Sequence, residues 1–292
     1  VMAEVQDAAL RDWIDAHCAF PCSMVDRIVP ATSDAVREAV VSELGVQDPS
    51  ALAVEAFWEW VIEDRFADPA DGALLAAQGV RVTPEVHVYE DAKLRMLNGS
   101  HTAMALIGAV TGRPFIADCI GAPHIRAFVH GLMGEEVVPS LQRSDWANYR
   151  DALIERFANP HLRHSVHQIA TDSSLKIPLR WVPSVQAQLA RGASVERHAL
   201  AAAIWLRHGL AVDEQGQTYT VNDPQAQWLQ ANASTQHEAP GRSLQALLER
   251  TDFWGDTLPH NAHWRSRVAH WHRTVLDAGV DRAIEQLLQT AP

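Results

Sequence analysis

The pattern of hydrophobic and polar residues changes character near residue 86. Before it, the apolar segments are short and of mixed period, and strict alternation of apolar residues with glutamates marks a strand with one buried face. The pattern predicts, in chain order, a helix over 4–16, an extended segment over 20–30, a helix from Ser33 or Asp34 to Leu44, a strand over 55–63 with Ala56, Trp58, Trp60 and Ile62 inward, and a short strand over 80–84.

After residue 86, apolar residues recur at helical spacing almost to the end of the chain. The predicted helices span 89–110, 123–132, 149–158, 162–171, 182–190, 195–206, 224–231, 243–250 and 261–288, the last broken near Gly279. We therefore predict a mainly α chain with two domains, an α/β region over 1–86 and a helical domain over 87–292.

Composition narrows the class of protein. Of 292 residues 47% are apolar, which suffices for a packed core, and the formal net charge of −12 argues against nucleic acid or an anionic membrane as the main partner. The longest apolar stretches, 102–110 and 199–206, are shorter than the roughly 18 residues of a membrane span. Three cysteines, Cys18, Cys22 and Cys119, fit reduced thiols, so we expect a cytoplasmic protein.

Lysine is nearly absent from this chain. Lysine and arginine together number 24, yet only Lys93 and Lys176 are lysines. An arginine keeps its charge permanently, whereas burial can bring a lysine's pKa towards neutrality and let it pass a proton. Two lysines retained in an arginine-using chain therefore suggest amine chemistry.

The residues around Lys93 strengthen that suggestion. On an ideal α-helix, Glu90, His101 and Asn98 project roughly 60°, 80° and 140° from Lys93, in one sector shared with apolar side chains. Apolar surroundings would lower the pKa of Lys93, and an ionised Glu90 would oppose this. Lys93 could then act as a base, Asn98 could donate to a developing oxyanion, and His101 could bind a hydroxyl.

Several blocks in this order resemble the mannitol dehydrogenase family of polyol-specific long-chain dehydrogenases. They are Phe20-Pro-Cys-Ser-Met-Val-Asp-Arg-Ile-Val-Pro30, Trp60-Val-Ile-Glu-Asp64, Lys93-x(4)-Asn98-x(2)-His101, Asn159-Pro160 and Asp172-Ser-Ser-Leu-Lys-Ile-Pro178. The resemblance implies a helical substrate domain of the 6-phosphogluconate-dehydrogenase-like type, preceded by the α/β tail of a Rossmann-type domain.

The resemblance also implies roles for individual residues. Lys93 would be the general base, Asn98 part of the oxyanion hole, His101 a substrate-binding residue and Glu90 the carboxylate on the proton path. Lys176 would contact substrate, and NAD would be the cofactor. The segment of Met24, Val25 and Asp26 would lie at the cofactor, with Asp26 near the nicotinamide or the substrate. The family reaction is zinc-independent.

Gln168 and Arg180 bear on which substrate is used. Mannitol dehydrogenases tend to carry arginine where this chain has Gln168, and the stretches 168–172 and 178–180 look more like the fructuronate reductases, also called D-mannonate oxidoreductases. A uronate carries a carboxylate that Lys176 and Arg180 could hold, with Gln168 also at the substrate. The pair D-mannonate and D-fructuronate is therefore predicted, with mannitol, another polyol and tagaturonate left open.

The glycines set a limit on cofactor binding. None of the fifteen forms Gly-x-Gly-x-x-Gly, the turn that cradles a dinucleotide pyrophosphate. We expect the chain to begin within the end of the cofactor domain, without the N-terminal Rossmann half, and to bind NAD weakly by itself. A catalytically silent helical interaction module is the alternative from another functional class.

Histidine and tryptophan are two further residue types that can form binding sites. His260, His263, His270 and His272 lack a carboxylate at a spacing typical of zinc sites, so no metal site is predicted. His161, His164 and His167 are spaced by three, as expected for the surface of a helix. The ten tryptophans are expected mostly in the core and at interfaces.

Overall fold

The computed structural model describes residue 4 and residues 7–290, and within them the prediction of a mainly helical chain is confirmed. The chain divides into two compact units. Unit 1 comprises the residues up to Val29 and Val54–Asp91, and unit 2 comprises Pro30–Ala53 and the chain from Ala92 onwards.

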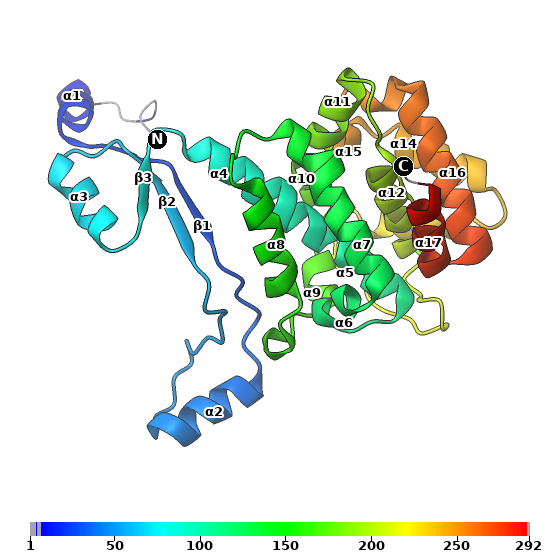
Figure 1. Ribbon diagram of the computed structural model, residues 1–292, viewed down its shortest axis with the longest axis horizontal. Helices are drawn as coiled ribbons and strands as arrows, with labels where there is room; N and C mark the ends of the chain where they lie inside the picture. Colours follow the sequence, from blue (N-terminus) through cyan, green and yellow to red (C-terminus); the bar gives the residue numbers. More distant parts are fainter. Residues whose placement is uncertain (1–3, 5–6, 291–292) are drawn as a thin grey trace. The chain divides into compact units, whose positions relative to one another are not determined.

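Unit 1 is built on a three-stranded sheet with helices beside it (Figure 1). Strands β1 (Ser23–Asp26) and β2 (Glu59–Glu63) are antiparallel, and β2 pairs in parallel with β3 (Arg81–Thr83). The helices are α1 (Ala8–His17), α3 (Pro69–Ala77) and α4 (Val86–Ala92). Met24, Val61 and Val86 form a small buried core against which Tyr89 packs. Residues 5 and 6 of the predicted first helix lie outside the described residues.

The strand predicted over 55–63 is shorter, and its predicted inward face is partly wrong. Ala56 and Trp58 are exposed, whereas Val61 is fully buried. The reason is that Ala56 and Trp58 precede β2, which begins at Glu59, and that within β2 the neighbouring residues Val61 and Ile62, on opposite faces, are both buried. Glu55 is also buried, and its Oε1 accepts the Ile28 N–H at 2.5 Å.

Unit 2 begins with α2 (Asp34–Leu44), which follows the predicted bounds. Ser33 occupies the N-cap position, and Gly45 closes the helix in the left-handed conformation at φ 70°. The helix ends there because a glycine adopts that conformation without steric cost.

The rest of unit 2 is helical throughout (Figure 1). Its elements are η2 (Lys93–Asn98), α5 (Gly99–Thr111), α6 (Ile116–Gly121), α7 (Pro123–Gly131), η3 (Leu132–Val137), η4 (Val138–Ser140), α8 (Trp146–Phe157), η5 (Pro160–Leu162), α9 (Val166–Ala170), α10 (Ser173–Arg180), α11 (Val182–Ala190), α12 (Glu196–His208), α13 (Ala226–Ser234), α14 (Pro240–Leu248), α15 (Thr251–Trp254), η6 (Leu258–His260), α16 (Ala262–Ala278) and α17 (Val280–Thr290). The predicted break near Gly279 is confirmed, with φ 84° at that residue.

Helix α5 lies at the centre of unit 2. All thirteen of its residues are buried, as expected for a helix that is apolar on nearly every side. It packs against α6, α9, α10 and α12, and α12 in turn packs against α16. The central position of α5 makes it a rigid support for the side chains at its N-terminal end.

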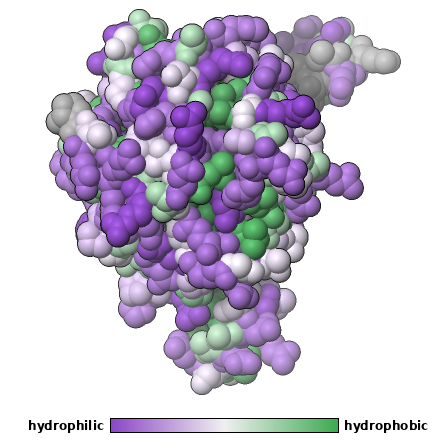
Figure 2. Space-filling view, turned by 90° about the vertical axis from the view of Figure 1, so that its right-hand side faces the viewer, coloured by the Kyte–Doolittle hydropathy of each residue, from purple (hydrophilic) through white to green (hydrophobic). Residues whose placement is uncertain are grey.

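Tryptophans fill much of the core, as predicted. Trp181, Trp205, Trp254, Trp264 and Trp271 are fully buried. Figure 2 shows the side of unit 2 on which α16 and α17 lie in Figure 1, where the surface is mostly hydrophilic with an apolar stripe near its middle. None of the described helices is long and apolar enough to cross a membrane.

A buried carboxylate fixes the start of α12. Glu136, fully buried on η3, accepts hydrogen bonds from the N–H groups of Arg197 at 2.7 Å and His198 at 3.0 Å, and it also contacts His198 Nδ1 at 2.7 Å. Carboxylates stabilise helix N-termini because the first N–H groups there lack partners within the helix. Since η3 also packs against η2, this anchor helps to hold the segment that carries Lys93.

Candidate functional site

A π-helical segment carries two of the predicted catalytic residues. Between α4 and α5, residues Lys93–Asn98 form the π-helix η2, and the Gly99 N–H donates to Leu94 O at its end. An ideal α-helix would place Asn98 about 140° from Lys93, but π-helical bonding joins residues five apart. Asn98 therefore lies slightly more than one turn after Lys93, on the same side, and the predicted α-helical angles are corrected.

The main chain of Asn98 is held from two sides. Its carbonyl accepts Thr102 Oγ1 at 2.9 Å and Arg180 Nη1 at 3.2 Å. In contrast, the buried side-chain Oδ1 has no hydrogen-bond partner within the described residues. Lys93 and Asn98 are both half-buried. The segment is thus fixed through its backbone, while the side-chain Oδ1 of Asn98 makes no bond to the described residues.

His101 lies one turn further along, buried in α5. Its ring is 5.1 Å from Phe157 and 4.7 Å from His164 between centroids, and its Nε2 has no hydrogen-bond partner in the part of the chain that the structure describes. Burial is the main reason that the pKa of His101 is well below its usual value. His101 is therefore a neutral imidazole at pH 7, able to donate to or accept from a hydroxyl.

Neighbouring groups lower the pKa of His101 further. They are His164 and three cations, Arg180, Arg156 and Lys176. Because a positive field disfavours the protonated imidazole, these groups act in the same direction as burial. They make the space around His101 favourable for a negatively charged group.

Helix α10 supplies two of these cations from a firmly anchored start. Asp223 accepts Ser173 Oγ at 2.9 Å and Ser174 N at 2.8 Å, which fixes the first turn. Lys176 and Arg180 are four residues apart and so lie on one face of the helix. Helix α10 thus carries both predicted substrate-binding cations, Lys176 and Arg180, on the same face.

Lys176 and Arg180 differ in their surroundings. Lys176 Nζ donates to the carbonyls of Ile169, at 3.1 Å, and Thr171, and its pKa is lowered by burial and then by Arg180. Arg180 Nη1 donates to Thr102 Oγ1 at 2.7 Å, and burial lowers the pKa of Arg180 to about 10. An arginine has five N–H donors, so the contacts with Thr102 and Asn98 leave others for a carboxylate.

The remaining predicted residues have varied environments. Gln168 is exposed on α9. In unit 1, Glu90 is exposed on α4, Asp26 is fully buried at the end of β1, Met24 is packed in the core, and Val25 is exposed. Within unit 2, the structure gathers Asn98, His101, Lys176 and Arg180 through direct contacts or mutual electrostatic effects.

Two further residues near His101, Arg156 and His164, were not predicted from the sequence as site residues. Arg156 is buried on α8, and His164 precedes α9 in a loop, so the expectation that His164 lies on a helix surface is wrong. The signal that could have revealed it is Asn159-Pro160, since an Asn-Pro pair indicates a turn. The described residues contain no group of three metal-ligating side chains that could hold a metal ion.

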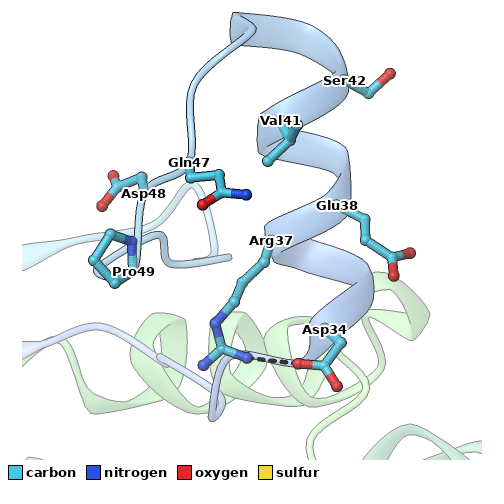
Figure 3. A pocket seen from close by; sticks show the side chains of 8 residues that line it. All are labelled: Asp34, Arg37, Glu38, Val41, Ser42, Gln47, Asp48 and Pro49. Carbon is cyan, nitrogen blue, oxygen red and sulfur yellow. Dashed lines mark hydrogen bonds and ion pairs between the residues drawn. The ribbon is translucent and has the colours of Figure 1, made fainter.

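A hollow of about 800 Å³ in unit 2 does not contain the predicted catalytic residues (Figure 3). It is formed by α2 and the loop after it, and its lining is Asp34, Arg37, Glu38, Val41, Ser42, Gln47, Asp48 and Pro49. All eight lining residues are exposed, and Arg37 and Asp34 form an ion pair at 2.8 Å. We place the candidate site at His101 because converging buried polar groups matter more than open volume.

Comparison with known proteins identifies the family of this chain. The mannitol dehydrogenase C-terminal domain matches residues 85–276, and the mannitol dehydrogenase Rossmann domain matches residues 1–71. The chain belongs to the mannitol dehydrogenase family. The predicted family resemblance is thus confirmed, and with it the type of helical domain.

Relatives and solved structures include several named dehydrogenases. The chain is 38% identical over 291 residues to the D-mannonate oxidoreductase of Escherichia coli K12, covering 98% of this chain and 59% of that protein. It is 39% identical over 265 residues to the mannitol 2-dehydrogenase of Phaeosphaeria nodorum, covering 88% and 44%. The ternary complex of Pseudomonas fluorescens mannitol 2-dehydrogenase with NAD and D-mannitol matches at TM-score 0.87 and 32% identity, covering 99% and 58%. The chain therefore spans less than two thirds of the length of these proteins.

Proposed function

We propose that this chain forms the substrate-binding part of an NAD-dependent dehydrogenase that interconverts D-mannonate and D-fructuronate. The observation that carries the proposal is the cation-rich surrounding of the buried, neutral His101, to which Arg156, Lys176 and Arg180 contribute. A sugar acid brings a carboxylate that such a field would stabilise, whereas mannitol brings none. The similarity to a D-mannonate oxidoreductase supports the same choice.

In this proposal Lys93, Asn98 and His101 each have a separate task. During oxidation, Lys93 Nζ takes the proton of the reacting hydroxyl while the hydride leaves its carbon and the C=O bond forms. Asn98 donates its amide to the oxygen on which negative charge develops, and His101 binds a neighbouring hydroxyl. NAD, when bound, accepts the hydride. In the reverse direction Lys93 returns the proton to the oxygen.

The described residues fit NAD in part. Val25 is exposed on β1 and offers an apolar side chain to a nicotinamide, whereas the neighbouring Asp26 is fully buried. The described helices do not begin with a glycine-rich turn of the kind that cradles a pyrophosphate. We accordingly propose that Asp26, Val25 and Met24 lie at the nicotinamide end of the cofactor only. We also propose that Glu90 lies on the proton path.

The test of the proposed function is turnover by the protein expressed from its complete open reading frame. NADH formation is measured by absorbance with D-mannonate, altronate and mannitol as substrates. We expect the highest kcat/KM with D-mannonate. Higher kcat/KM with mannitol would favour the second candidate, a mannitol 2-dehydrogenase, which the match to that enzyme's structure supports. No turnover of any of them would favour a silent interaction module.

Substitutions of Lys93 test its role as the base. Lys93→Ala should lower kcat by about 10²- to 10⁴-fold, the usual contribution of a positioned general base. Lys93→Arg should not restore it, because a guanidinium stays protonated. Unchanged NADH affinity would locate the defect in chemistry. Wild-type kcat in Lys93→Ala would contradict the assignment.

A further inference from the structure

A second histidine, His164, faces the site without a role in the proposed reaction. It lies between η5 and α9, and its main chain is tightly fixed. Its carbonyl accepts the Ile116 N–H at 3.0 Å, and two residues later the Val166 N–H donates to Pro114 O at 3.1 Å. Phe115 and Ser165 also form an isolated β-bridge. The position of His164 is therefore set by a neighbouring loop and not by a helix of its own.

The residue before it has an unusual backbone. Arg163 has φ 41°, a left-handed conformation that costs a non-glycine residue of the order of 1 kcal/mol. Its guanidinium lies over the Phe115 ring, 4.6 Å from the centroid. Non-glycine residues in this region persist where the surrounding structure enforces them, and they concentrate at functional sites. Here the left-handed residue turns the chain, so that the Arg163 side chain lies over Phe115 and the His164 ring lies against His101.

The ring of His164 is placed against that of His101. The two centroids are 4.7 Å apart and the planes meet at 77°, so one ring approaches the other edge-on. His164 Nδ1 is buried and, among the described residues, has no hydrogen-bond partner, and the same is true of His101 Nε2. Burial lowers the pKa of His164 to about 4, so the imidazole is neutral at pH 7.

A buried nitrogen without a partner needs an explanation. Leaving such a group unsatisfied costs stability, so buried polar atoms usually meet a protein group, a water or a ligand. Two such atoms on adjacent neutral imidazoles match two neighbouring hydroxyls of a polyhydroxylated chain, because each imidazole can donate or accept.

We propose that His164 is a second substrate-binding residue, whose Nδ1 hydrogen-bonds a hydroxyl of the open-chain six-carbon substrate next to the one bound by His101. The proposal rests on the proposed function for the identity of the substrate. It does not require a carboxylate, so it applies equally to a polyol.

The test uses substitutions that separate the two ring nitrogens. The amide of asparagine can occupy the place of histidine Nδ1, whereas that of glutamine reaches the place of Nε2. We expect His164→Ala to raise the KM for D-mannonate about tenfold with a smaller change in kcat, since a ground-state hydrogen bond is lost. His164→Asn should recover most of the affinity, and His164→Gln should not.

Binding and folding are measured beside the kinetics. Calorimetric titration with D-mannonate should show the same order of dissociation constants as the KM values. His161→Ala is the matched control, because His161 is exposed on η5, three residues before His164, and should behave as wild type. Circular dichroism and NADH affinity should be unchanged in all variants.

Three outcomes separate the two proposals. Wild-type KM and dissociation constant in a folded His164→Ala protein would overturn the role of His164. Equal recovery by asparagine and glutamine would overturn the assignment to Nδ1. If the wild type oxidises mannitol and not D-mannonate, the proposed substrate fails, and the same variants measured with mannitol still decide whether His164 binds a hydroxyl.

Discussion

Buried histidines distinguish this chain at the level of single residues. His101, His164, His208 and His272 all have pKa values lowered chiefly by burial. His101 and His164 face the candidate site, whereas His208 stacks on Tyr219 and has neither ring nitrogen bonded within the described residues. Neutral imidazoles serve hydroxyl binding, but they make the folded state sensitive to acid.

The pH dependence of stability follows from His208. Its pKa is about 4 when folded and near 6.5 when unfolded, so below about pH 6.5 the unfolded state binds more protons. The free energy of unfolding should therefore fall as pH falls from 7 to 5, and His208→Phe should make that fall shallower by up to about 1.4 kcal/mol per pH unit. Urea unfolding at pH 5, 6 and 7 measures it. An unchanged slope in the variant would show that His208 is not the residue responsible.

At the level of elements, close packing against α5 fixes the site. Gly108 on α5 allows α6 and α9 to approach, since a Cβ there would lie 2.6 Å from Val166 Cγ1 and 2.7 Å from Cys119 Sγ. Helix α9 in turn leads to the carbonyl of Thr171 that holds Lys176. A methyl group added at Gly108 would therefore displace α9 and, through Thr171, the proposed substrate-binding residue Lys176.

Gly108→Ala should destabilise the fold by about 1–3 kcal/mol, the usual cost of overpacking. Gly121→Ala is the matched control, because nothing lies within 4 Å of its added Cβ and helical alanine is favoured over glycine. Thermal unfolding of both variants checks this. Equal melting temperatures for the two would show that the contacts of α5 with α6 and α9 relax without cost.

The sequence predicts elements well where their ends carry a chemical signal. Helix α11 spans its predicted residues, and Gly279 ends α16 because a left-handed residue stops the helix. The π-helix η2 was not predicted, because one extra residue per turn leaves no mark on composition. His164 was missed because spacing by three in the sequence does not reveal that a neighbouring loop holds the backbone.

At the scale of the whole molecule, the acidic net charge contrasts with the cations near His101. The formal net charge is −12, yet three local cations lower the pKa of that histidine. Whether the net negative charge or the nearby cations dominate for an anionic substrate depends on the distance of each charge from the substrate. At 0.1 M salt the screening length is about 10 Å, so dispersed surface charges are largely screened while cations in contact are not.

At 1 M salt the screening length falls to about 3 Å, so even the attraction of the nearby cations weakens, and the KM for D-mannonate should rise several-fold between 0.1 and 1 M. Mannitol is the matched neutral control, and its KM should stay nearly constant. Steady-state kinetics at constant pH with a monovalent salt provide the measurement. Equal changes for both substrates would indicate a general effect of salt on the protein and would contradict a carboxylate at the cation group.

The π-helix η2 also matters to anyone who transplants this chemistry into a designed protein. Copying Lys93, Asn98 and His101 with their native spacing onto a straight α-helical scaffold would rotate the lysine away from the asparagine by about a third of a turn. Such a scaffold needs the two residues four positions apart, or else an inserted residue that reproduces the wider turn. The sequence motif is therefore transferable only together with its backbone.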